Sequence, residues 1–218
     1  MNEQQRTVFL VDDDASVRRG LERLMRAAGY AVEAFASADE FLARLPLQGV
    51  GCAILDVQMP GVSGPQLHER LLELEVGIPV LFLTAHGDVP TGVSAIKRGA
   101  LDFLMKPVDG DVLLEAVGQA MARHASEVVR DQARRGIEAR LARLSLRERQ
   151  VMEGVIAGRL NKQIASDLAI SEKTVKVHRS RVMEKMEAGS LAELVHLCES
   201  LDITAVQNGD NGSSRVAD

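Results

Sequence analysis

Residues 7–14 have the sequence TVFLVDDD, a short apolar run that ends abruptly in three acidic residues. An apolar run of this length, bounded by polar residues, predicts a buried β-strand. Apolar residues then recur at helical spacing from Val17 to Ala28, and Gly29 ends this predicted helix. The stretch therefore predicts one strand followed by one helix.

The same alternation continues to about residue 123. Further strands are predicted at 31–35, 52–55, 79–83 and 102–105, and further helices at 38–44, 64–75, 89–98 and 109–123. Nearly continuous apolar strands between helices indicate a parallel sheet that is covered on both faces. The first half is thus predicted to be an α/β domain with a doubly wound, five-stranded parallel sheet.

The composition is that of a globular protein with room for two small domains. Hydrophobic residues make up 46% and charged residues 26% of the 218 residues. Aromatic residues are only 3%, without Trp, which argues against aromatic platforms that stack on sugars or bases. The two cysteines, Cys52 and Cys198, are too few for a disulfide framework or a Cys-rich metal cluster. With no signal peptide or membrane-spanning apolar run, we expect a cytoplasmic protein without a membrane partner.

The charge distribution indicates two domains with different partners. The formal net charge is −6 in residues 1–123 and +2 in 124–144, while residues 145–203 are balanced. The predicted organisation is an α/β domain over 7–123, a helical linker over 124–143, a small all-helical domain over 144–203 and a disordered tail over 204–218.

Polar residues with complementary chemistry follow four of the predicted strands. In an open parallel sheet, ligands bind beyond the carboxyl ends of the strands. The residues at these ends are Asp12, Asp13, Asp56, Thr84 and Lys106. A single such Asp would more simply cap the next helix, but three carboxylates at one point repel each other unless a cation lies between them. An all-oxygen set favours Mg²⁺.

The remaining strand-end residues suit phosphoryl chemistry. Lys106 can pair with a carboxylate or a phosphate, and the Thr84 hydroxyl can donate to a phosphoryl oxygen. An Asp carboxylate can act as the nucleophile and form an aspartyl phosphate. The sequence therefore predicts phosphoryl transfer to a carboxylate at this edge.

Residues 7–123 resemble the CheY-like receiver domain of two-component signalling. The matching segments are VDDD (11–14), LDVQMPG (55–61), LTA (83–85) and FLMKP (103–107). The resemblance implies that Asp56 is the phospho-acceptor and that Thr84, Lys106 and the aromatic Phe103 sense the phosphoryl group. It also implies Mg²⁺, or alternatively Mn²⁺, held by Asp13, Asp56 and the backbone carbonyl of Gln58, with Asp12 acting through water. The implied switch region includes Val89, Val93, Ile96, Lys97 and Ala100. Some of its apolar residues belong to the core, and the implied dimer surface is the exposed subset Val89, Val93, Ile96 and Lys97.

The second domain has the pattern of a helix-turn-helix. A short helix packed by Ile164, Ala165 and Leu168 precedes a turn, and Ser171 is a good N-cap for the next helix. That helix has a predicted buried stripe of Val175, Val182 and Met186, and five cations elsewhere. Val177 lies off the stripe, where it could contact a thymine methyl. The alternative is a solvated helix with one stray Val.

Residues 144–195 resemble the LuxR-type DNA-binding domain. The matching segments are LRERQV (146–151), AG (157–158), NKQIA (161–165) and ISEKTVKVHR (170–179). The resemblance implies phosphate contacts by Asn161, Lys162, Lys173 and Thr174, and a groove-facing set of Lys176, Val177, Ser180 and Arg181. His178 has a surface or packing role in this interpretation. An internal ion pair between Glu148 and Lys176 is an alternative that would remove Lys176 from base reading.

The two resemblances in this order are similar to response regulators of the FixJ/NarL class, on the FixJ side. They imply a transcriptional regulator whose Asp56 is phosphorylated by a sensor histidine kinase, after which the receiver controls dimerisation and DNA binding. The implied partners are the kinase, double-stranded promoter DNA, a second copy of the chain and RNA polymerase.

Two other function classes, a phosphohydrolase and an RNA-binding protein, fit the sequence less well. Asp-nucleophile phosphohydrolases carry a second Asp where this chain has Gln58, and they often carry a substrate cap that this chain lacks. The only turnover we expect is therefore slow hydrolysis of the chain's own aspartyl phosphate. An RNA-binding output is disfavoured because the deep, narrow major groove of RNA does not admit a recognition helix easily.

Overall fold

The computed structural model describes residues 6–85, 96–201 and 203. It divides the chain into two compact units, Met1–Val129 and Arg130–Asp218. The predicted helix at 89–98 falls mostly outside the described residues, as do Val89 and Val93 and the predicted tail at 204–218.

The first unit contains the predicted parallel sheet. Its strand order is β2-β1-β3-β4-β5, and every pairing is parallel. The strands are β1 (Arg6–Val11), β2 (Ala31–Phe35), β3 (Val50–Asp56), β4 (Val80–Thr84) and β5 (Asp102–Met105). The central strands β3 and β4 are buried along their whole length. This burial explains their continuous apolar sequences, because helices cover both faces.

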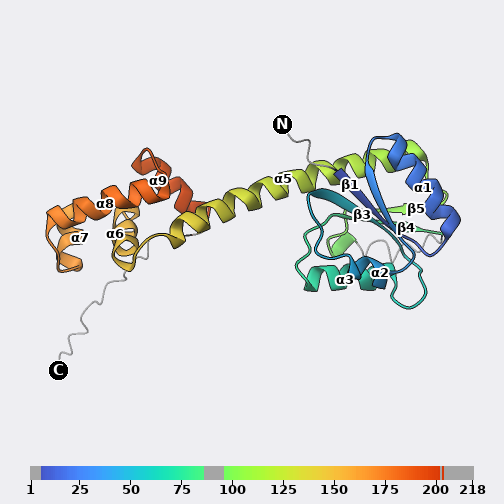
Figure 1. Ribbon diagram of the computed structural model, residues 1–218, viewed down its shortest axis with the longest axis horizontal. Helices are drawn as coiled ribbons and strands as arrows, with labels where there is room; N and C mark the ends of the chain where they lie inside the picture. Colours follow the sequence, from blue (N-terminus) through green and yellow to red (C-terminus); the bar gives the residue numbers. More distant parts are fainter. Residues whose placement is uncertain (1–5, 86–95, 202, 204–218) are drawn as a thin grey trace, which may run out of the picture. The chain divides into compact units, whose positions relative to one another are not determined.

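Helices lie on both faces of the sheet (Figure 1). Helices α1 (Ala15–Ala27) and α5 (Gly110–Ala142) cover one face, where Met25 and Val117 are fully buried. Helices α2 (Ala38–Ala43) and α3 (Gly64–Glu73) cover the other, where Phe41 and Leu67 are fully buried. The sheet is therefore held between two separate apolar cores, and the doubly wound fold is confirmed.

A close backbone approach fixes the loop after β3. A Cβ on Gly64 would lie 2.2 Å from the backbone oxygen of Asp56, so no larger residue fits without a backbone shift. The Gly64 amide also donates to the Val57 carbonyl at 3.2 Å. Ser63 caps α3 in a capping box with Gln66. The start of α3 is thus held directly against the end of β3, where Asp56 lies.

The second unit consists of helices around one apolar core. After the end of α5 come α6 (Leu146–Ile156), α7 (Asn161–Asp167), α8 (Glu172–Met186) and α9 (Leu191–Glu199). Val151, Val175, Met186 and Leu194 are fully buried between these helices. Among the described residues, no helix is long and apolar enough to cross a membrane.

Candidate metal centre and nucleic-acid interface

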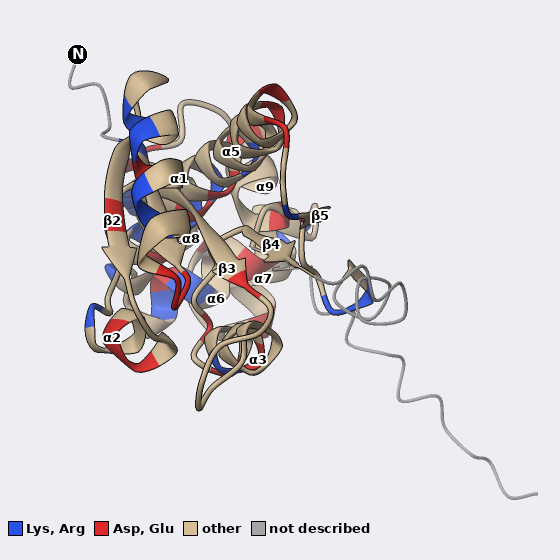
Figure 2. Cartoon of the chain, turned by 90° about the vertical axis from the view of Figure 1, so that its right-hand side faces the viewer, with Lys and Arg blue, Asp and Glu red and all other residues tan. Residues whose placement is uncertain are grey.

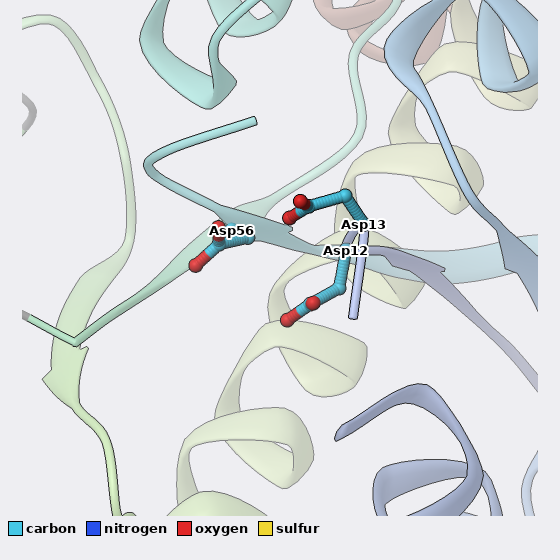
Figure 3. A group of neighbouring side chains, drawn as sticks. All are labelled: Asp12, Asp13 and Asp56. Atoms are coloured by element: carbon cyan, nitrogen blue, oxygen red, sulfur yellow. The ribbon is translucent and has the colours of Figure 1, made fainter. Parts of the chain in front are cut away.

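Three carboxylates meet at the carboxyl edge of the sheet. Asp12 and Asp13 follow β1, Asp56 ends β3, and the two strands are neighbours in register with Val11 opposite Leu55. One oxygen from each carboxylate lies within 4.8 Å of the others (Figure 3). Asp12 and Asp56 are only 3% and 7% exposed, whereas Asp13 is exposed. The predicted cluster is therefore assembled by strand pairing.

Lys106 joins two of these carboxylates. Its Nζ lies 2.6 Å from Asp12 Oδ2 and 2.8 Å from Asp56 Oδ1. The lysine follows β5, and its amide donates to the carbonyl of Thr84 at 2.7 Å. Thr84 ends β4 and is buried. The four strand ends thus bring the acids, Lys106 and Thr84 to one edge of the sheet.

The site changes the acid–base properties of Asp56 and Lys106. Burial raises the pKa of Asp56, the negative charges of Asp12 and Asp13 raise it further, and the Lys106 ammonium opposes both effects. Burial lowers the pKa of Lys106, but its hydrogen bonds to Asp12 and Asp56 and their charges outweigh burial and raise it. The ionised form of Asp56 therefore depends on nearby positive charge.

The donor set fits a hard divalent cation. The three carboxylates supply oxygen ligands at close range, and Lys106 neutralises only part of their charge. The side chain of Gln58, two residues after Asp56, is exposed. The chemistry of these groups is that of a Mg²⁺ site rather than a zinc site.

Sequence reasoning missed two residues beside this cluster. Asp14 accepts hydrogen bonds from the Ser16 and Val17 amides and so caps α1, and these bonds lower its pKa. Arg18 Nη1 donates to the Asp12 carbonyl at 2.5 Å. Arg18 is one of several arginines on α1, which carries basic residues along its length in Figure 2. A side chain that binds a backbone carbonyl leaves no spacing pattern, so the sequence could not single it out.

The predicted switch surface is described only in part. Phe103 is half-buried, and its ring centre lies 6.4 Å from that of Phe82. Ile96 and Lys97 are exposed, but Ala100 is 6% exposed and packs into a receiver core, so it is no surface residue. Met105 and Val112 are further exposed apolar residues of this unit, outside the predicted surface.

The helix-turn-helix pattern is present in α7 and α8. The Ser171 side chain accepts from the Thr174 amide at 3.1 Å and caps α8, while Val175, Val182 and Met186 are buried as expected. Asn161 Oδ1 accepts a hydrogen bond from Arg179 Nη1 at 2.8 Å. The expected DNA-contact residues that are exposed are Lys162, Lys173, Lys176, Val177, Ser180 and Arg181. Thr174 is half-buried, and its hydroxyl lies 2.8 Å from that of Ser171.

The considered ion pair between Glu148 and Lys176 is wrong. Glu148 instead pairs with Lys185, whose Nζ lies 2.6 Å from Glu148 Oε2. Lys176 and Lys185 are nine residues apart, which is two and a half helical turns, so they lie on opposite sides of α8. Lys176 is exposed. Its side chain therefore faces solvent rather than the partner that the alternative required.

Glu148→Gln is expected to destabilise the second unit by about 2 kcal/mol at pH 7, because it breaks a largely buried ion pair. Glu148 is 3% exposed, and the Lys185 hydrogen bond followed by the Ser145 amide lowers its pKa from 4.5 to about 2. A lowered pKa stabilises the fold above the unfolded value of 4.5, and this stabilisation disappears as the pH falls through about 2.

Urea unfolding of both proteins between pH 7 and pH 2 measures this effect. The difference in unfolding free energy should shrink as the pH falls. Glu153→Gln, an exposed change on the same helix, is the control. A constant difference at all pH values would contradict the assigned pairing.

Both halves of the chain match known families. Residues 8–118 match the response regulator receiver domain, and residues 142–198 match the bacterial regulatory proteins of the luxR family. A receiver followed by a LuxR-type DNA-binding domain defines the class of phosphorylation-dependent transcription regulators. The chain belongs to the FixJ family of response regulators.

The similarity extends over nearly the whole chain. The transcriptional regulatory protein FixJ of Bradyrhizobium diazoefficiens is 44% identical, with 87% of this chain and 93% of the relative covered. FixJ of Rhizobium meliloti is 46% identical, with 88% of this chain and 94% of the relative covered. The solved response regulator StyR is 46% identical and covers 89% of this chain and 98% of its own, with a TM-score of 0.83.

Proposed function

We propose that Asp56 accepts a phosphoryl group from the histidine of a sensor kinase. An oxygen of the Asp56 carboxylate attacks phosphorus, the bond from phosphorus to the histidine nitrogen breaks, and that nitrogen keeps the bonding electron pair. The observation that carries this proposal is the place of Asp56, buried at the carboxyl edge of the sheet with Lys106 2.8 Å away. Pairing with Lys106 favours the ionised carboxylate, which is the form that can attack phosphorus.

The other strand-end residues would prepare and sense this step. Asp13, Asp56 and the backbone carbonyl of Gln58 would hold Mg²⁺ or Mn²⁺, with Asp12 acting through water. When bound, the cation supplies positive charge to the phosphoryl oxygens. Lys106 would move its pairing from the Asp56 carboxylate to the phosphoryl group, and the Thr84 hydroxyl would donate to the same group.

The output would be dimerisation and tighter DNA binding. Movement of Thr84 and Phe103 would change the surface that includes Val89, Val93, Ile96 and Lys97. The exposed apolar residues Met105 and Val112 support an extension of this dimer surface. A phosphate can shift the population of receiver states only by interacting differently with them. Two joined chains double the phosphate contacts to DNA and make binding strongly salt-dependent.

In the second unit, α8 would enter the major groove of promoter DNA. Lys176, Val177, Ser180 and Arg181 would face the base edges. Asn161, Lys162, Lys173 and Thr174 would contact the phosphate backbone. The exposed side of α8, opposite its buried stripe, supports this assignment. Bound at a promoter, the dimer would act on RNA polymerase.

Oligomeric state and DNA retention, measured together, test this function. Light scattering and a gel shift on random genomic fragments are run with and without a small phosphodonor plus Mg²⁺. The mass is expected to double and specific fragments to shift only after treatment. Phosphate on Asp56 without a change in mass or DNA retention would contradict the dimer mechanism while leaving the acceptor assignment intact.

A further inference from the structure

The last turns of α5 belong to the core of the second unit. Ile137 of α5 and Leu144, two residues after the end of α5, are 6% and 8% exposed, and both pack in the same cluster as Val182 and Met186 of α8. Leu141 lies between them in sequence and packs against the same cluster. The segment predicted from sequence as a linker therefore ends as a packed part of the DNA-binding unit.

Arg140 binds the end of α8 directly. Its Nη1 donates to the carbonyl of Met186, the last residue of α8, at 3.0 Å. The same nitrogen lies 3.7 Å from Oε2 of Glu187, which ends the helix in the left-handed conformation with φ 55°. The last carbonyls of a helix lack partners within the helix and carry partial negative charge, so a guanidinium there satisfies both needs.

Two further contacts join the same segments. Lys185 of α8 donates from Nζ to the Arg143 carbonyl at 3.1 Å. Arg143 Nη1 lies 3.5 Å from Glu187 Oε1. Each segment therefore supplies a donor to a backbone carbonyl of the other. These hydrogen bonds connect the residues at and just after the end of α5 to the end of α8.

Two of these residues, Ile137 and Arg140, lie before the matched DNA-binding domain. The luxR-family match begins at residue 142, after Ile137 and Arg140. We propose that Arg140 is a positioning residue for DNA recognition, which fixes the C-terminal end of α8 and so the orientation of its base-reading side. This inference rests on the proposed contact between α8 and the major groove.

Base reading and phosphate binding differ in how much misorientation they tolerate. Hydrogen bonds to base edges need accurate placement of short contacts, whereas long lysine side chains can follow a phosphate when the helix tilts. Loss of the Arg140 contact should therefore reduce specific binding more than non-specific binding. It should not change the number of phosphate contacts, which sets the salt dependence.

The test uses the full chain treated with phosphodonor and Mg²⁺. The probes are a genomic fragment recovered by gel shift and a random-sequence duplex of equal length. Arg140→Ala is expected to weaken binding to the recovered fragment about tenfold, the effect of losing roughly one base contact, with an unchanged salt slope. Binding to the random duplex should stay within about twofold. Arg140→Lys should restore much of the loss, since an ammonium can also donate to the Met186 carbonyl.

Two control variants separate the possible failures. Arg134→Ala removes another α5 arginine, whose ion pair is with Glu138 of the same helix, and should bind like the unchanged protein. Lys176→Ala should leave phosphorylation unchanged but weaken binding and lower the salt slope if Lys176 contacts phosphate, or weaken the specific fragment alone if it reads a base. Unchanged binding of Lys176→Ala would count against the α8 assignment, not against Arg140.

Three results would overturn the positioning role of Arg140. Unchanged specific binding in Arg140→Ala would show that α8 is oriented without it. A salt slope reduced by about one would make Arg140 itself a phosphate contact. Equal losses on both probes, together with a lower unfolding temperature, would reduce the contact to a purely structural one.

Discussion

Asp56→Asn is expected to abolish labelling by a radioactive or mass-tagged phosphodonor, because the amide oxygen is a poor nucleophile and leaves the carboxyl edge without its acceptor. Asp13 is one alternative acceptor in the cluster, but it is exposed, and among the described residues the ion pairs of Lys106 are with Asp12 and Asp56. Mass spectrometry after treatment with phosphodonor and Mg²⁺ measures the stoichiometry. The fraction of chains that carry a phosphoryl group is expected to fall from a measurable value in the unchanged protein to background in Asp56→Asn.

The same variant should fold. Burial raises the pKa of Asp56, so the folded state favours the protonated carboxyl, and the stabilisation by that proton is lost as the pH rises through the raised value. Ionisation of the buried Asp56 carboxyl therefore lowers the stability of the fold, and neutral Asn does not carry this cost. Loss of the Lys106 pair opposes this gain, and Lys106 still has Asp12 at 2.6 Å. Thermal unfolding should show stability within about 1 kcal/mol of the unchanged protein.

Asp14→Asn is the matched control for Asp56→Asn. Asp14 caps α1 through the Ser16 and Val17 amides, and Asn is an equally good N-cap. Labelling should persist in this variant. If Asp56→Asn were labelled to the same stoichiometry as the unchanged chain, the acceptor would have to be another residue.

The acidic cluster could be predicted from sequence because its geometry follows from topology. Apolar strands that alternate with helices along the chain form a parallel sheet, and their carboxyl ends then lie along one edge. Asp12 and Asp56 are 44 positions apart in sequence, yet the pairing of β1 with β3 makes them neighbours. The direct ion pairs from Lys106 to both acids are a detail of side-chain packing that topology does not give.

Contacts between helices were harder to predict. Glu148 had a basic helix as its expected partner, but sequence did not determine which lysine of that helix would face it. Lys185 satisfies the pair because it lies near the same buried side as Val182 and Met186. Arg140 gave no signal at all, since its main partner is a backbone carbonyl, and every residue has one.

The charge balance at the carboxyl edge of the sheet makes phosphorylation of Asp56 dependent on a divalent cation. The cluster contains three carboxylates, Lys106 pairs with two of them, and those two acids are almost fully buried. A phosphoryl group carries further negative charge, so its arrival at Asp56 would be opposed by Asp12 and Asp13. Lys106 alone cannot neutralise this set, whereas a divalent cation among the oxygens can.

Chelation with EDTA is therefore expected to abolish labelling of Asp56, and added Mg²⁺ should restore it fully. Asp13→Asn should raise the Mg²⁺ concentration needed for half-maximal labelling by roughly tenfold or more, because it removes one anionic ligand. Titration calorimetry without phosphodonor measures Mg²⁺ binding directly, and the Mg²⁺ affinity of Asp13→Asn should fall in parallel. This measurement separates metal affinity from the phosphoryl transfer step. Asp39→Asn, on the exposed start of α2, is the control and should bind Mg²⁺ normally. Labelling that persists in EDTA would reject the metal assignment, and normal Mg²⁺ affinity in Asp13→Asn would move the ligand set away from β1.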